Sequence, residues 1–330
     1  MQFQFKHVDN FLNLISKSYQ QISNYLNMKY YYNIMNNTSK NIKINKKEIS
    51  IYGVDLVNPK YYKIWIRRNL KDKFKVKFDK HIPDYLIYNI FGDEHLKNKY
   101  KNSIKIAIFT ENKIPDLNEA DYAIGQAHIN YLDRCFKFPF FLWYNIKKIK
   151  IVREKLLKSQ KKTKFCAAVM SNGGKDNYRA KFINELSKYK KIDMGGKLYN
   201  NVGGQVKDKI KFLSSYKFSI AMENSEGDGY VSEKLFDSFI SGTIPIYYGD
   251  YTVDEYINPK AFILIKNEKN IKEKIEYIKY IDNNNEKYMN ILKENVLMNE
   301  NIVNIIEKEK KDFLYNIFSQ EKEKARRIYK

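Results

Sequence analysis

The sequence predicts an α/β protein built from two Rossmann-like lobes that face each other across a cleft, and three features lead to this prediction. Short apolar runs alternate with helix-type segments in both halves of the chain. A basic stretch with few turn formers, residues 145–164, separates the two halves. In the second half, a glycine-broken turn joins an apolar strand to an apolar-striped helix, an arrangement at which parallel α/β proteins bind ligands.

The length and composition agree with two folded domains. The chain has 330 residues, of which 43% are hydrophobic, and domains usually contain about 100–200 residues. Sixty Lys and Arg residues against 38 Asp and Glu residues give a formal net charge of +22. This charge would attract nucleic acid, anionic lipid or phosphorylated small molecules, and it does not by itself distinguish among them.

The cysteines and the apolar runs argue against a secreted disulfide framework and a membrane span. Cys135 and Cys166 lie in apolar surroundings, without the spacing of a disulfide framework or a structural zinc site. No apolar run is long enough for a signal peptide or a transmembrane helix. We therefore expect a cytoplasmic protein, with contact to a membrane surface through basic helices such as the C-terminal one as an additional expectation. The alternative is that the C-terminal helix packs back across the lobes.

The first lobe is predicted over residues 46–150, after an N-terminal extension, residues 1–45, to which we assign no chemistry. Strand-type runs in this lobe are EISIYGVDL, FKVKF, DYLIYNIFG, IKIAIFT and DYAIG. Residues 145–164 (NIKKIKIVREKLLKSQKKTK) carry the boundary with the second lobe, and a solvated linker helix is favoured there over a nucleic-acid contact.

The second lobe is predicted over residues 151–300. The strand FCAAVM is followed by the polar turn SNGGKDN and the helix YRAKFINELSKY, and further on come the helix KDKIKFLSSY and the strands KFSIAMEN and TIPIYYG. Helices are expected over residues 270–295 and 300–328, the last as a C-terminal helical tail, residues 301–330.

Residues 223–249, ENSEGDGYVSEKLFDSFISGTIPIYYG, hold the candidate site of the second lobe. The helix EKLFDSFIS has one apolar face and begins at Glu233, so that Lys234 lies in its first turn. A cation is disfavoured there by the helix dipole, and an anionic ligand would reverse this cost. The alternative is that Ser232 caps the helix, Glu233 complements the dipole and Lys234 points to water.

This stretch resembles the donor-binding motif of the α-1,3/4-fucosyltransferases of glycosyltransferase family 10. In that motif an Glu-Asn-Ser/Thr strand end precedes a Tyr-Val-Ser/Thr-Glu-Lys step and a Gly-Thr-x-Pro-Ile/Val-Tyr-x-Gly strand. Upstream, FCAAVMSNGGKDNYRAKFINELSKYKKIDMGGKL and IFTENKIPDLNEADYAIGQAHINYLDRCFKFP resemble other segments of the family, the latter in its bacterial members. The resemblance covers about residues 80–295, and a match of this length is far more specific than a lone glycine fingerprint.

The resemblance implies a GT-B type fold, GDP-fucose as the donor, and transfer with inversion and without an essential metal. By motif, Arg179 and Lys234 would neutralise the diphosphate, for which a guanidinium fork and an ammonium point charge are suited. Asn224, Tyr230 and Glu233 would line the same donor pocket, where an amide, a phenol and a carboxylate suit ribose and fucose hydroxyls. Turn-capping and packing are the alternative roles of Asn224 and Tyr230.

Glu111 in FTENKIP, at the end of the strand IKIAIFT, would be the general base that the resemblance implies. An inverting displacement needs a carboxylate within hydrogen-bond reach of the attacking hydroxyl. The alternative is an exposed loop glutamate beside a proline. The sequence departs from the bacterial pattern here, because it lacks the glycine that often stands between Thr110 and Glu111.

The predicted activity is therefore transfer of L-fucose from GDP-fucose to the 3-hydroxyl of a GlcNAc or glucose unit in an oligosaccharide acceptor, lactose-like or N-acetyllactosamine-like. We expect no metal site and no cofactor, because the sequence has no Asp-x-Asp pair and its four histidines lack metal spacing. Two alternatives stay open: a GT-B transferase with another nucleotide-sugar donor, and a basic protein that binds nucleic acid or an anionic membrane. No nucleic-acid-binding motif supports the latter.

Overall fold

A computed structural model describes residues 46–328 of the chain, apart from residues 57, 90, 130, 144–145, 159–161 and 172–177. Backbone contacts divide the chain into two compact units. Unit 1 comprises Met1–Phe138 and Asn304–Lys330, and unit 2 comprises Pro139–Val303. The predicted extension over residues 1–45 and most of the predicted turn SNGGKDN lie outside the described residues.

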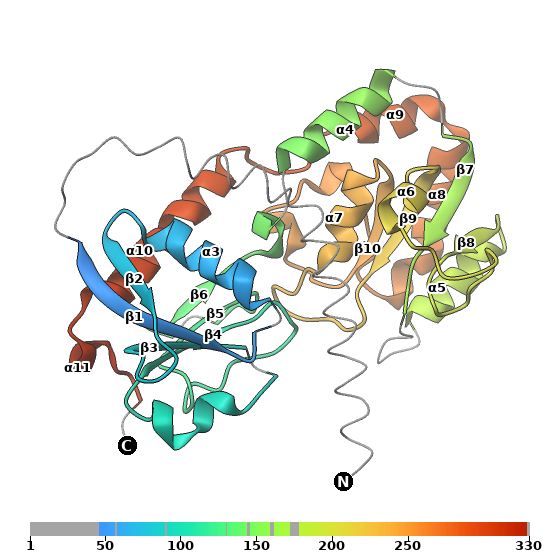
Figure 1. The fold of residues 1–330 in the computed structure, drawn as a ribbon. Helices are drawn as coiled ribbons and strands as arrows, with labels where there is room; N and C mark the ends of the chain where they lie inside the picture. Colours follow the sequence, from blue (N-terminus) through green and yellow to red (C-terminus); the bar gives the residue numbers. More distant parts are fainter. Residues whose placement is uncertain are drawn as a thin grey trace, which may run out of the picture. The chain divides into compact units, whose positions relative to one another are not determined.

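Unit 1 is built on one parallel sheet in the strand order β2-β1-β3-β4-β5-β6 (Figure 1). The strands form where apolar side chains are buried on both faces of the sheet, as in IKIAI of β4, and this explains their nearly continuous apolar runs. Five of the six strands coincide with predicted ones, and β6 was not predicted. The strands are β1 (Lys47–Val54), β2 (Phe74–Phe78), β3 (Tyr85–Tyr88), β4 (Ile104–Ile108), β5 (Tyr122–Gly125) and β6 (Cys135–Lys137).

Helices of unit 1 come from both ends of its sequence. Helix α3 (Pro59–Leu70) begins after Asn58, whose side chain accepts a hydrogen bond from the Tyr61 N–H at 3.0 Å. Helix α10 (Ile302–Ser319) buries Phe318 against the ring of Tyr85, with 4.6 Å between ring centroids. The remaining helices are the short α11 (Lys322–Ala325) and the 3₁₀ turns η1 (Glu94–Leu96) and η2 (Asn98–Tyr100).

The domain limits differ from the predicted ones in two places. The C-terminal segment is part of unit 1 rather than a separate tail, because its aromatic side chains complete the core of that unit. The boundary lies after Phe138 rather than after residue 150, because helix α4 (Ile146–Lys158) packs within unit 2. Arg153 of α4 donates hydrogen bonds to the carbonyls of Ile291 at 2.6 Å and Leu292 at 3.1 Å.

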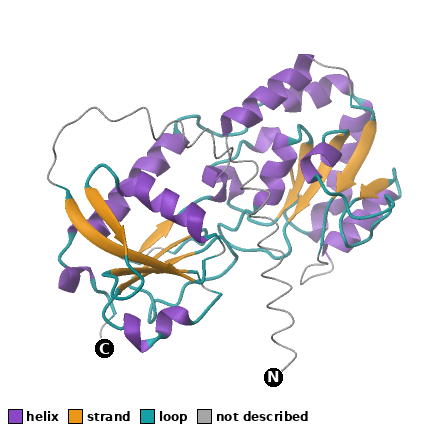
Figure 2. Cartoon of the chain, in the orientation of Figure 1, coloured by secondary structure: helices purple, strands orange, loops and turns teal. Residues whose placement is uncertain are grey.

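Unit 2 is built on a second parallel sheet in the order β11-β10-β9-β7-β8. Figure 2 shows its strands flanked by helices. Helices α5, α8 and α9 bury their apolar stripes in one core with the sheet, and α7 packs on β9 and β10. The strands are β7 (Lys164–Ala168), β8 (Ile192–Met194), β9 (Tyr216–Met222), β10 (Ile244–Tyr248) and β11 (Ile263–Leu264). The remaining helices are α5 (Tyr178–Ser187), α6 (Lys209–Leu213), α7 (Glu233–Ile240), α8 (Ile271–Asn283) and α9 (Asn285–Lys293), with 3₁₀ turns η3 (Phe140–Trp143), η4 (Val253–Glu255), η5 (Pro259–Ala261) and η6 (Glu268–Asn270).

The predicted α/β class with two Rossmann-like units is confirmed, since each unit has a parallel sheet with helical segments packed on it. None of the helices in the described part of the chain is both long enough and apolar enough to cross a bilayer.

Candidate functional site

The candidate site of unit 2 lies where two neighbouring parallel strands end. Strands β9 and β10 pair from Phe218 with Ile244 to Met222 with Tyr248, so their carboxyl ends meet at one edge of the sheet. Residues 223–232 follow β9 and lead into helix α7, and Gly249 and Asp250 follow β10. In parallel α/β proteins this edge is where ligands bind.

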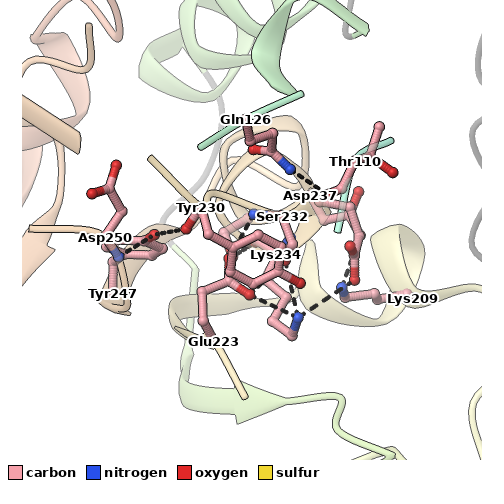
Figure 3. A network of polar contacts seen from close by, with 12 residues as sticks. Thr110, Gln126, Lys209, Glu223, Tyr230, Ser232, Lys234, Asp237, Tyr247 and Asp250 are labelled. Atoms are coloured by element: carbon pink, nitrogen blue, oxygen red, sulfur yellow. Dashed lines mark hydrogen bonds and ion pairs between the residues drawn. The ribbon is translucent and has the colours of Figure 1, made fainter. Parts of the chain in front are cut away.

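Lys234 is held by side chains of its own unit (Figure 3). Its ammonium donates hydrogen bonds to Glu223 Oε2 and to Ser232 Oγ, each at 2.9 Å. Glu233 Oε1 lies 3.8 Å from the same nitrogen. The Lys234 side chain is 19% exposed, whereas that of Glu223 is 0% exposed. The buried carboxylate of Glu223 therefore offsets the cost of a cation in the first turn of α7. From the sequence, we expected an anionic ligand to fill this role.

Ser232 caps helix α7, as the alternative interpretation of this stretch predicted. Its Oγ accepts a hydrogen bond from the Lys234 N–H at 3.4 Å. The same residue also donates from its hydroxyl to Glu223 Oε2 and from its backbone N–H to Glu223 Oε1, both at 2.7 Å. That interpretation also expected Lys234 to point to water. The structure differs here, since the Lys234 ammonium donates two hydrogen bonds within the unit.

The charges around Lys234 favour its protonated form. Burial of the ammonium opposes its charge, but the carboxylates of Glu223 and Glu233 outweigh burial and raise the pKa of Lys234 above its ordinary value. Arg179 acts in the opposite direction on this pKa, so its guanidinium is close enough to contribute to the same local field. Lys234 is consequently a cation throughout the physiological pH range.

Glu233 is kept ionised by two lysines. Burial disfavours its charge, while Lys234 and Lys209 outweigh burial and hold the pKa of Glu233 below its ordinary value. Lys209 of α6 also forms an ion pair with Asp237 of α7, with Nζ 2.8 Å from Oδ2. The sequence interpretation did not include Lys209, because nothing in KDKIKF distinguishes it from the other lysines.

Asp250 fixes the loop between β9 and α7. Its Oδ1 accepts hydrogen bonds from the Gly229 N–H at 3.1 Å and from the Thr252 N–H at 2.9 Å. Gly229 has φ +82°, a conformation that glycine adopts without steric cost. Tyr247 joins the loop to β10, since its hydroxyl donates to the Tyr230 carbonyl at 3.4 Å and accepts from the Asp250 N–H at 3.1 Å. Gly229 and Tyr230 of the turn are thus both hydrogen-bonded to residues in β10 or directly after it.

The predicted site residues of unit 2 are brought together in part. The charges of Arg179 and Glu233 both act on the pKa of Lys234, Arg179 lowering it and Glu233 raising it. Asn224 follows Glu223 directly and is half-buried, and Tyr230 is only 6% exposed. No role was assigned to Glu223 from the sequence; a carboxylate directly after the largely buried strand KFSIAM was the signal that could have identified it.

Glu111, the predicted base, lies in unit 1. It follows β4 by three residues, is partly buried, and its carbonyl accepts a hydrogen bond from the Lys113 N–H at 2.8 Å. Gln126, which follows β5, donates from its side chain to the carbonyl of Thr110. This contact braces the backbone immediately before Glu111, which stands at the carboxyl edge of the first sheet.

Within the described residues, no group of three or more His, Cys, Asp and Glu side chains is placed to hold a metal ion. The positive charge near the turn comes from Arg179, Lys209 and Lys234.

Comparison with known proteins identifies the family. Residues 159–312 match the model of the glycosyltransferase family 10 (fucosyltransferase) C-terminal region, and residues 51–144 match that of the alpha-(1,3)-fucosyltransferase FucT N-terminal domain. The chain belongs to glycosyltransferase family 10. The two matches fall on units 2 and 1 respectively for most of their length.

Curated relatives match this chain over part of their own length. It is 30% identical over 246 residues to the alpha-(1,3)-fucosyltransferase FucT of Helicobacter pylori, a match that covers 65% of this chain and 52% of the relative. It is 38% identical over 152 residues to the putative fucosyltransferase R654 of Acanthamoeba polyphaga mimivirus, which covers 42% of this chain and 25% of that protein. The chain thus spans about half or less of the length of these relatives.

Solved alpha1,3-fucosyltransferase structures share the fold. A crystal structure of an alpha1,3-fucosyltransferase is 25% identical, has a TM-score of 0.71, and aligns over 86% of this chain and 93% of that one. A crystal structure of alpha1,3-fucosyltransferase with GDP-fucose is 25% identical, has a TM-score of 0.67, and aligns over 84% and 93%.

Proposed function

We propose that the chain transfers L-fucose from GDP-fucose to the 3-hydroxyl of a GlcNAc or glucose unit in a glycan acceptor of the lactose or N-acetyllactosamine type, with inversion at the anomeric carbon. The observation that carries this proposal is the hydrogen-bonded group of Glu223, Ser232 and Lys234 at the ends of β9 and β10. It lies in a chain that matches the family 10 C-terminal model and the FucT N-terminal model. The solved structure with GDP-fucose supports the choice of donor.

In this proposal, Lys234 and Arg179 bind the diphosphate. An ammonium has three N–H donors, and two of those on Lys234 are used by Glu223 and Ser232 among the described residues, which leaves the third for a phosphate oxygen. Arg179 adds a second cation that stays charged at any physiological pH. Together they stabilise the negative charge that grows on the leaving GDP as the glycosidic bond breaks.

Asn224, Tyr230 and Glu233 are assigned to the nucleoside and the sugar. Glu233 remains ionised, so it accepts hydrogen bonds from hydroxyl groups and is repelled by phosphate oxygens. A carboxylate near the sugar ring also stabilises the positive charge of an oxocarbenium-like transition state.

Glu111 is assigned as the general base. The acceptor hydroxyl attacks the anomeric carbon on the face opposite to GDP, its proton passes to the Glu111 carboxylate, and the bond to the diphosphate oxygen breaks. Arg179 and Lys234 supply the positive charge that a metal ion would otherwise supply to the leaving group. The proposal therefore requires neither a divalent metal nor a cofactor.

The test is a transfer assay with GDP-fucose and a panel of lactose and N-acetyllactosamine acceptors, with and without EDTA. We expect product in both conditions. Glu111→Gln should lower kcat by about 10²- to 10⁴-fold while GDP binding stays within a factor of two, because only proton transfer is lost. Glu119→Gln, a partly exposed carboxylate of the same unit, is the matched control and should retain activity.

Three outcomes would contradict parts of this proposal. Full transfer by Glu111→Gln would refute the base assignment, and loss of product with EDTA would refute metal independence. Metal-free binding of a UDP-sugar without a response to GDP would favour another nucleotide-sugar donor.

A cytoplasmic location and contact with a membrane surface are the remaining parts of the proposal. The formal net charge of +22 supports attraction to anionic lipid. Co-sedimentation with vesicles that contain phosphatidylserine, lost at high salt, is the expected result, and equal sedimentation with neutral vesicles would contradict an electrostatic contact.

A further inference from the structure

We propose that Glu223 is a positioning residue for donor binding: it holds the Lys234 ammonium in place and keeps it protonated, so that the donor site retains this positive charge in the neutral and alkaline range. This inference rests on the proposed function, in which Lys234 contacts the diphosphate of GDP-fucose.

The two oxygens of Glu223 are committed to the residues that begin helix α7. Oε1 accepts the Ser232 N–H at 2.7 Å, and Oε2 accepts both the Ser232 hydroxyl at 2.7 Å and the Lys234 ammonium at 2.9 Å. Since Lys234 also donates to Ser232 Oγ at 2.9 Å, the three side chains form a closed triangle of hydrogen bonds. An ammonium bound at two points of a rigid triangle has little freedom to turn away from the sheet edge.

The position of Glu223 is itself fixed by the sheet. Its N–H donates to the Tyr248 carbonyl at 2.7 Å, which extends the pairing of β9 and β10 by one residue. On its other side lies Gly249, where an added Cβ would be 2.5 Å from Glu223 Cγ and 2.8 Å from the Tyr247 hydroxyl oxygen. The glycine that ends the motif therefore leaves the space into which the Glu223 side chain fits.

Charge explains why a cation needs this partner. Lys234 is largely buried, and burial alone would favour the neutral amine. Among the described residues, Glu223 and Glu233 favour the ammonium and Arg179 disfavours it, while Lys209 is paired with Asp237 beside Glu233. Without the charge of Glu223, only Glu233, at 3.8 Å, would oppose burial and Arg179, so the pKa of Lys234 would fall.

This reasoning gives Glu223→Gln a specific signature in GDP binding measured by calorimetry from pH 6.5 to 9.5. In the unmodified chain Lys234 stays charged, so this residue contributes no change of affinity with pH. In Glu223→Gln the affinity should fall as Lys234 loses its proton, so that the ratio of the two dissociation constants rises about tenfold or more across this range. A residue with only a structural role would change affinity or stability without this dependence on pH.

Two further variants make the test decisive. Glu223→Gln combined with Lys234→Arg should remove the pH dependence, since a guanidinium stays charged. Asp282→Asn is the matched control, because Asp282 is a buried carboxylate that also binds lysines, Lys190 at 2.5 Å and Lys217 at 2.7 Å, with Lys217 near the start of β9 rather than after its end. It should lower stability and leave the pH profile of GDP binding unchanged.

The outcomes separate this inference from the function on which it rests. If the unmodified chain does not bind GDP, the proposed function fails and the inference fails with it. If it binds GDP and the ratio of dissociation constants for Glu223→Gln is constant with pH, the inference alone is overturned. Should Glu223→Gln fail to fold, Glu223→Asp retains the charge with a shorter reach: affinity reduced severalfold without a new alkaline loss supports the inference, and unchanged affinity overturns it.

Discussion

Replacement of Lys234 by methionine should destabilise unit 2 more than any other single lysine substitution at this site. The substitution keeps an unbranched side chain up to the ε-carbon but removes the ammonium 2.9 Å from Glu223 Oε2. The Glu223 side chain is 0% exposed, so its charge would then be buried without a counter-ion. Breaking a buried pair in this way costs about 3–5 kcal/mol in the free energy of unfolding.

The magnitude follows from burial and can be checked against a neighbouring pair. Lys209→Met breaks the ion pair with Asp237, whose side chain is 11% exposed and therefore reached by water, so we expect a smaller loss of about 1–2 kcal/mol. In the double variant Glu223→Gln, Lys234→Met neither member of this buried pair is charged. Its loss should be smaller than the sum of the two single losses by about 1–3 kcal/mol, as expected for residues in direct contact.

Urea unfolding followed by circular dichroism gives these free energies, and thermal unfolding gives an independent check. A loss of 3–5 kcal/mol corresponds to a decrease in Tm of about 6–20 °C for a unit of this size. Two results would refute the argument: a smaller loss for Lys234→Met than for Lys209→Met, or a double variant whose loss equals the sum of the single losses.

Two other predictions concern stability. Gly249→Ala should lower the free energy of unfolding by about 1–3 kcal/mol and weaken GDP binding, because the new Cβ would lie 2.5 Å from Glu223 Cγ. An unchanged GDP affinity in calorimetry would contradict this, since Glu223 would then be able to move aside. Burial, with the nearby charge of Arg153, lowers the pKa of Lys162 to about 7, well below the value near 10.4 of an exposed lysine. The unfolded chain therefore binds more protons than the folded one between these values, and the stability of the unmodified chain should rise with pH in this window. The free energy of unfolding of Lys162→Met, minus that of the unmodified chain, should be more positive at pH 7 than at pH 10 in urea unfolding. An equal difference at both pH values would contradict this.

Most of the sheet strands could be predicted from the sequence because burial on both faces leaves long apolar runs such as IKIAI and KFSIAM. The strands that were missed, β6, β8 and β11, have only two or three residues. Runs this short carry no periodic pattern, and they become strands only because a neighbouring strand pairs with them. Helix α3 was not predicted as a separate element, although Asn58 and Pro59 are signals of a helix start.

The order of elements was predictable, but the limits of the units were not. The apolar stripe of α10 is visible in the sequence, and it indicates a buried face without indicating what covers it. In the structure that face packs on Tyr85 and Tyr122, which are about 200 residues earlier in the chain. Contacts between such distant residues are decided by tertiary packing, so the C-terminal helix belongs to unit 1.

The sequence by itself determined the class of the fold, the family, and the chemical types gathered in ENSEGDGYVSEKLF, because burial periodicity and a long motif are local properties of the chain. Only the tertiary structure decided how Lys234 is used. Its position in the first turn of α7 indicated that a negative charge must be near, but Glu223 and Lys234 are 11 residues apart, separated by a turn. The pairing of β9 with β10 and the space left by Gly249 bring that carboxylate under the helix, and so the cation has a partner within the protein before any ligand binds.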